Sequence, residues 1–125
     1  MKITRLLVVL AALVSLTAVG AGAASATTVD VCQGQLMMLR DNTLAAEASF
    51  TNQKDIGGLV TKLDAASAKL AAGKNTDAVA KLVDFQTTLN TLATDPKPKV
   101  DPAVAQELSD DAQGVIYCIN EIGTA

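Results

Sequence analysis

Two cysteines and a short acidic cluster are the residues of this chain that could carry chemistry. Cys32 and Cys118 could form a disulfide, or act as a reactive or metal-binding thiol pair. Glu107, Asp110 and Asp111 could bind calcium or transfer protons. The sequence contains no histidine, which excludes Ser-His-Asp and Cys-His pairs, imidazole zinc sites and histidine-ligated haem.

The acidic cluster is better explained as a solvated helix surface than as a site. Adjacent helical positions such as Asp110 and Asp111 face different directions. The segment over 95–101 lacks the alternating oxygen ligands and the final glutamate of a calcium loop. We therefore predict no catalytic residue, no cofactor and no metal site.

Three further groups of side chains also favour a structural explanation. Met37 and Met38 could line a soft-metal or hydrophobic ligand site, but two adjacent methionines are more often core filler. Lys97 and Lys99 could touch an anionic surface, but they suit solubilising charges on a proline-rich loop. Tyr117 could ligate haem, but one tyrosine in a chain without histidine is weak evidence for a haem site.

The N-terminal segment has the pattern of a secretory signal peptide. Two basic residues among the first five precede an uncharged stretch over 6–19 and small residues over 20–26. The stretch is shorter than the roughly 20 residues that span a bilayer, so we expect cleavage rather than a retained anchor. The sequence before Cys32 does not match a lipoprotein signal. We predict a signal peptide over 1–26 and a secreted domain over 27–125, extracellular or associated with the cell wall.

Charge narrows the choice of partners for the secreted domain. Cleavage removes two of the ten basic residues and leaves all thirteen acidic ones, for a net charge of −5. An acidic surface gains nothing from counterion release on nucleic acid and is not drawn to anionic lipid. We predict no nucleic-acid partner and no membrane partner after cleavage. The remaining candidates are an extracellular protein or a cell-wall component.

Four segments repeat apolar residues at alternating spacings of three and four, which is typical of helices that face a common core. No segment alternates with period two, and the connections between the first three segments are short. We therefore predict an all-α, up-down-up-down four-helix bundle. The expected stripes are Cys32, Leu36, Leu39, Thr43, Ala46 and Phe50; Ile56, Leu59 or Val60, Leu63, Ala66 and Leu70; Ala78, Leu82, Phe85, Leu89 and Leu92; and Val104, Leu108, Asp111 or Ala112, Val115, Cys118 or Ile119, and Ile122.

Capping residues mark the expected helix ends. Asn52 suits the start of the second helix, Gly73 its end, and Asp101-Pro102 the start of the fourth. Two features oppose this pattern. Gly57-Gly58 costs helix stability unless the helix begins later or another backbone passes close by. Asp41-Asn42 could break the first helix, although its stripe continues to Phe50, so we keep one helix there.

The two cysteines allow one intramolecular disulfide, which is the usual state of an even number of cysteines in an exported protein. In the expected bundle, the start of the first helix and the end of the fourth lie at the same end. Cys32 and Cys118 both lie on or beside their apolar stripes. We therefore predict a Cys32–Cys118 disulfide, worth about 4 to 5 kcal/mol in the chain-entropy model. A reactive thiol pair would have neither C-x-x-C spacing nor a histidine.

The central residues of the chain resemble the FIMAH module, a small helical domain usually appended to secreted bacterial hydrolases and surface proteins. The resemblance implies a non-catalytic accessory domain and brings no catalytic residues. The departures from its usual pattern are the signal peptide directly before the module and the cysteine pair. The residues that carry the resemblance lie at 50–52, 58–66, 70–74, 78–85 and 105–116, and include Lys62-Leu63-Asp64-Ala65-Ala66 and Lys81-Leu82-Val83-Asp84-Phe85.

These observations favour a secreted, non-catalytic helical module that acts by binding or scaffolding. The alternative is a small exported helical-bundle inhibitor of an extracellular enzyme. An enzyme or ligand carrier is the third hypothesis, which an apolar pocket with converging carboxylates would favour.

Overall fold

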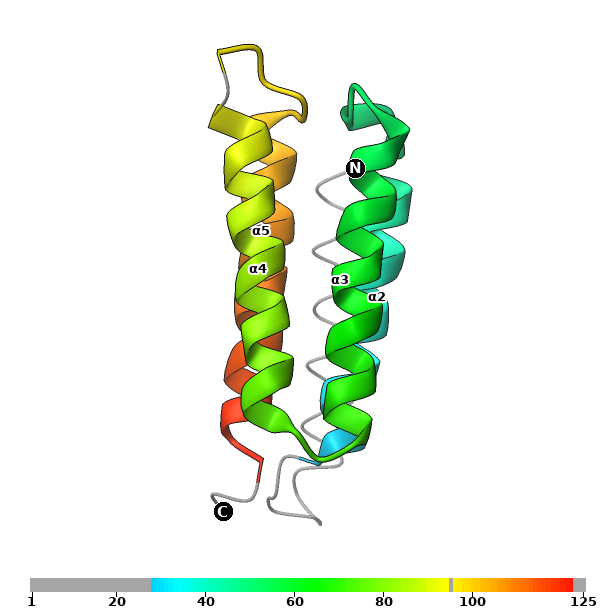
Figure 1. The fold of residues 1–125 in the computed structure, drawn as a ribbon, viewed down its shortest axis with the longest axis vertical. Coiled ribbons are helices and arrows are strands. Elements are labelled where there is room, and N and C mark those ends of the chain that lie inside the picture. Colours follow the sequence, from blue (N-terminus) through cyan, green and yellow to red (C-terminus); the bar gives the residue numbers. More distant parts are fainter. Residues whose placement is uncertain (1–27, 95, 123–125) are drawn as a thin grey trace, which may run out of the picture.

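The computed structural model describes residues 28–94 and 96–122, and within these ranges the chain is all-α with no strand. Its long axis runs along four helices, and Figure 1 shows successive helices running in opposite directions. The elements are α2 (Val29–Ala45), the 3₁₀ turn η1 (Glu47–Ser49), α3 (Gln53–Ala71), α4 (Asn75–Thr94) and α5 (Pro102–Asn120). The predicted all-α class with four helices is confirmed.

The helices form a ring in which α2 packs on α3 and α5, and α4 packs on the same two helices from the other side. The α3–α4 and α4–α5 contacts are more extensive than the contacts of α2 with either neighbour. Consequently α2 is the helix held least by packing alone.

The core consists of one apolar stripe from each helix, and the predicted stripes are mostly correct. Where alternatives were open, the structure buries Leu59 and Ala112 and leaves Asp111 exposed. Cys118 and Ile119 are both buried. The stripe of α5 differs from the prediction at its start, where Ala105 is buried and Val104 lies at the edge of the core.

The predicted caps are formed. The backbone N–H of Lys54 donates to the Asn52 side chain at 3.0 Å, and that of Ala103 donates to the Asp101 carboxylate at 2.9 Å. Gly73 follows the end of α3 with a φ of 78°, a left-handed conformation that glycine adopts without steric cost.

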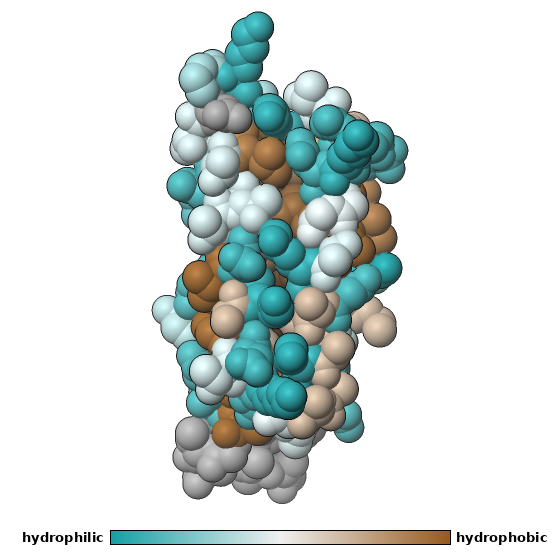
Figure 2. Space-filling model, in the orientation of Figure 1, coloured by the Kyte–Doolittle hydropathy of each residue, from teal (hydrophilic) through white to brown (hydrophobic). Residues whose placement is uncertain are grey.

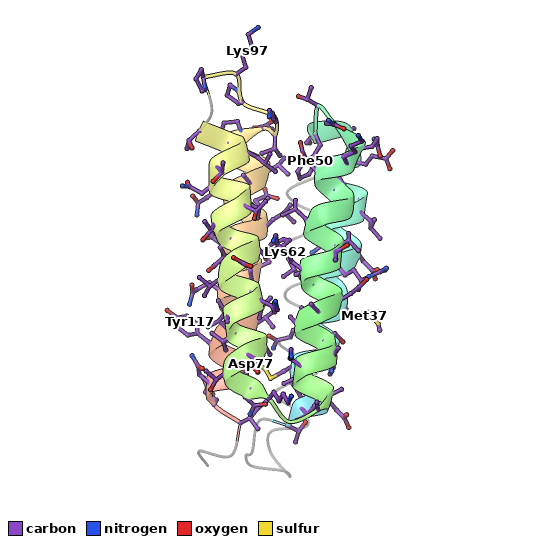
Figure 3. The ribbon with its side chains drawn as sticks, viewed as in Figure 1. Met37, Phe50, Lys62, Asp77, Lys97 and Tyr117 are labelled. Carbon is purple, nitrogen blue, oxygen red and sulfur yellow. A yellow bond between two sulfur atoms is a disulfide. The ribbon has the colours of Figure 1, made fainter. Side chains whose placement is uncertain are left out.

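The first helix is shorter than predicted. It runs through Asp41-Asn42 without a break but ends at Ala45, so the expectation that it continues to Phe50 is wrong. Phe50 has an extended backbone and forms an isolated antiparallel bridge with Val100. Its side chain still enters the core, from the loop rather than from the helix (Figure 3). A buried residue at helical spacing therefore did not require a helical backbone.

The segment over 1–26, predicted to be a signal peptide, lies outside the described residues. None of the described helices is long and apolar enough to cross a membrane.

Candidate functional site

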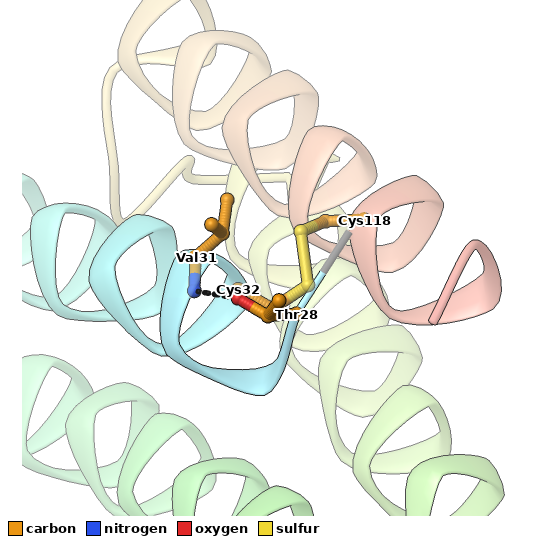
Figure 4. Close-up of a disulfide and its surroundings, with 4 residues drawn as sticks. All are labelled: Thr28, Val31, Cys32 and Cys118. Carbon is orange, nitrogen blue, oxygen red and sulfur yellow. Dashed lines mark hydrogen bonds between the residues drawn. A yellow bond between two sulfur atoms is a disulfide. The ribbon is translucent and has the colours of Figure 1, made fainter. Parts of the chain in front are cut away.

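A disulfide joins Cys32 in the first turn of α2 to Cys118 in the last turn of α5, as predicted (Figure 4). The two Cα atoms are 5.7 Å apart, a usual distance for a disulfide, and the bond links residues 86 positions apart. Both side chains are buried. Beside Cys32, the N–H of Val31 donates to the Thr28 hydroxyl at 3.3 Å and caps α2. Since both sulfurs are bonded and buried, the pair has a structural role.

The acidic cluster does not converge on a common point. Asp110 accepts a hydrogen bond from Gln106 on its own helix at 2.9 Å, and Asp111 faces Asn42 of α2 at 3.5 Å. Both carboxylates are exposed. Among the described residues, no group of three acidic or cysteine side chains is placed to hold a metal ion.

The methionine pair lies on the surface, so the interpretation of these residues as core filler is wrong. Met37 is 66% exposed and Met38 57%. Leu36 and Leu39 occupy the buried positions of this turn, and the two residues between them necessarily point to other sides of the helix. Figure 3 shows Met37 projecting outward from the molecule.

Exposed large apolar side chains are concentrated on α2. Of the six that the described residues contain, four belong to this helix and one each to α4 and α5. The α2 residues are Val31, Met37, Met38 and Leu44, and the others are Val83 and Tyr117. Figure 2 shows the molecule from the side of α3 and α4, where polar side chains cover most of the surface and apolar areas are small and separate. The side of the molecule that contains α2 therefore differs in character from the α3–α4 side.

A groove of about 250 Å³ runs between α2 and α5, and is called here the α2–α5 groove. Its α2 wall consists of Gln35, Met38 and Asn42, and its α5 wall of Asp110, Asp111 and Gly114. The buried side chains Leu39 and Val115 form its floor. The groove thus combines an apolar floor with an acidic edge.

A second groove, of about 310 Å³, lies between α2 and α3. An ion pair crosses it, because the Arg40 Nε donates to the Asp64 carboxylate at 2.9 Å. In the same groove, the Ser67 hydroxyl donates to the Gln33 side-chain oxygen at 2.7 Å, and the Gln33 side-chain N–H donates to the Ser67 backbone carbonyl at 2.9 Å. These polar contacts connect α2 to α3 across the groove.

The other singled-out residues lie apart from both grooves. Lys97 and Lys99 are on the exposed loop before α5, and the Lys99 backbone accepts from the Thr51 N–H at 2.8 Å. Tyr117 is 61% exposed and projects from the side of the molecule opposite Met37 (Figure 3). The structure therefore does not bring the lysines, the tyrosine and the acidic cluster into one site.

Sequence reasoning missed the exposed apolar residues of α2, which lie on two flanks of the helix: Met38 lines the α2–α5 groove and Met37 the α2–α3 groove. The signal was present, because Val31, Met38 and Leu44 are apolar residues that do not fit the predicted stripe of this helix. A helix with one buried side leaves its remaining apolar residues exposed to solvent.

Fold and site together define a small all-helical module whose first and last helices are joined by a disulfide. The chain belongs to the FIMAH domain family: the family model matches residues 41–117, well over half of the sequence. The resemblance found in the sequence is thereby confirmed, and the chain is a small helical accessory module. No curated protein and no solved structure matches it.

Proposed function

We propose that this chain is a secreted, non-catalytic module that binds a partner protein or a cell-wall component at or outside the cell envelope. The observation that carries the proposal is the match to a family of small accessory helical domains over residues 41–117. The disulfide supports the extracellular location, because such bonds form and persist mainly in oxidising compartments. The concentration of exposed apolar side chains on α2 supports binding.

Export is tested by expressing the full chain in a secreting bacterial host and analysing the protein from the culture supernatant. Mass spectrometry should find Thr27 at the N-terminus and a mass two hydrogens below that of the dithiol form. A protein that stays in the cells with its N-terminal segment attached would contradict secretion.

Binding is tested by immobilising the exported, oxidised protein and applying supernatant and cell-wall fractions of the host under mild crosslinking. One partner should be captured reproducibly, and the same protein unfolded by reduction and alkylation in urea should not capture it. Absence of any fold-dependent capture would overturn the proposal. A captured enzyme that loses activity on binding would instead establish the inhibitor alternative.

A further inference from the structure

We propose that the α2–α5 groove is the docking surface of this module and that its occupant is a basic amphipathic helix of a partner protein. The inference rests on the proposed binding function and adds the place of contact and the chemistry of the partner.

The first argument is the apolar character of the groove. Met38 stands beside a floor made by Leu39 and Val115, and it is 57% exposed. Methionine is flexible and polarizable, so it adapts to apolar side chains of different shapes. Leu39 and Val115 are 1% and 2% exposed, so Met38 is the exposed apolar side chain of the groove that a helix lying along it would contact.

The second argument is Gly114, in the α5 wall of the groove. A glycine inside a helix costs about 1 kcal/mol relative to alanine. A Cβ atom at this position would meet no atom within 4 Å, so no contact inside the described chain requires glycine. The missing side chain leaves open space on α5 at this point of the groove, as it also does at Gly34, Gly57 and Gly58 on other helices.

The third argument is the distribution of charge, which selects the occupant. Helices α2 and α5 together carry five carboxylates and one basic residue, a net charge of −4. The one basic residue, Arg40, is directed to Asp64 of α3 and away from the α2–α5 groove. By contrast, α3 and α4 carry four lysines and four aspartates, which balance. Of the five carboxylates, Asp110 and Asp111 line the α2–α5 groove, Asp41 lines the α2–α3 groove, and Asp30 and Glu107 line neither.

The negative charge of α2 and α5 favours a cationic partner over a second copy of the chain or an anionic lipid surface. A second copy would bring its own acidic α2–α5 side against this one, and like charges placed opposite each other oppose association. An anionic lipid surface would be repelled in the same way. Lysine or arginine residues flanking an apolar stripe match both the floor and the edge of the groove.

A defined peptide pair tests the inference. The probe is an 18-residue amphipathic peptide of leucine and lysine with one tryptophan on its apolar face, and its counterpart has glutamate at every lysine position. The protein contains no tryptophan, so the fluorescence reports the peptide alone. The exported, oxidised protein should bind the lysine peptide saturably, and the glutamate peptide at least about tenfold more weakly. Binding should weaken several-fold as salt rises from 50 to 300 mM, because salt screens the acidic edge.

Two matched variant pairs locate the contact. Met38→Lys in the groove should weaken binding of the lysine peptide about tenfold or more, whereas Val83→Lys, at a similarly exposed apolar residue of α4, should leave it unchanged. Asp110→Lys should also weaken binding, whereas Asp77→Lys in α4 changes the net charge equally and should have little effect. Circular dichroism should show the same helix content in all four variants.

Several outcomes would overturn the inference. Equal weakening by the groove and α4 variants would mean that the peptide senses only net charge. Equal binding of both peptides would show that the acidic edge of the groove does not select a cationic partner. Self-association of the protein that Met38→Lys abolishes would assign the surface to a second copy. If a native partner is captured but Met38→Lys does not reduce its capture, the α2–α5 groove is not the docking surface, while the proposed binding function stands.

Discussion

At the scale of single residues, position on the helix decides whether an apolar side chain builds the core or the surface. Leu36 and Leu39 are buried, and Met37 and Met38 between them are exposed, although all four are apolar. Residue type alone does not separate them. Their spacing separates them, because Leu36 and Leu39 are three positions apart and therefore lie on the same side of the helix.

Leu82 and Val83 give the sharpest test of this rule, since they are neighbours in α4 with opposite environments. Leu82 is fully buried and Val83 is 47% exposed. Leu82→Ala should lower the free energy of unfolding by about 2 to 5 kcal/mol, because it removes buried methyl groups and leaves a cavity. Val83→Ala should change it by less than about 0.5 kcal/mol. Urea denaturation of the oxidised proteins measures both, and equal losses would reject the placement of Leu82.

At the scale of the helix, glycines separate into those that the fold requires and those that it does not. Gly73 has a positive φ and ends α3. Gly57 and Gly58 are exposed residues in the first half of the same helix, and an added Cβ at either would meet nothing within 4 Å. Neither condition that the sequence suggested would remove their cost to helix stability is met. Helix α3 begins before both glycines, at Gln53, and a Cβ added at either would contact no other part of the described chain.

Substituting two of these glycines by alanine should therefore change stability in opposite directions. Gly58→Ala should stabilise the protein by about 0.5 to 1 kcal/mol, because alanine loses less conformational entropy in a helix and fits the open space. Gly73→Ala should destabilise it by about 1 kcal/mol, because a Cβ is strained at a φ of 78°. Thermal unfolding of the pair measures the difference. Two shifts of the same sign would contradict this assignment.

Much of the helical structure followed from local signals. Asn52, Gly73 and Asp101 act on their own backbone within a few residues, so their roles could be predicted from the sequence. The end of the first helix could not be predicted, because Phe50 is placed by its bridge to Val100, which is 50 positions away in the sequence. The α2–α5 groove was also missed, since its edge arises only when Asn42 and Asp111 come together from different helices. The end of the first helix and the groove both depend on contacts between distant parts of the chain, which local sequence patterns do not reveal.

At the scale of the whole molecule, the disulfide joins the first turn of α2 to the last turn of α5. Both cysteines lie outside the residues 41–117 that match the FIMAH model, as does the first part of α2. This helix contacts its neighbours less extensively than α3 and α4 contact each other. The Cys32–Cys118 bond therefore holds in place the helix that also carries most of the exposed apolar side chains.

Removing the bond should consequently destabilise α2 more than the rest of the bundle. The double variant Cys32→Ser/Cys118→Ser should unfold with a free energy lower by about 2 to 5 kcal/mol than that of the oxidised protein. Amide hydrogen exchange should show protection lost first in α2 and retained longest in α3 and α4, because local opening follows the extent of packing. The oxidised wild type treated with reductant is the control and should approach the variant. Uniform loss of protection in all four helices would show that the bond stabilises the bundle as one unit and gives α2 no special dependence on it.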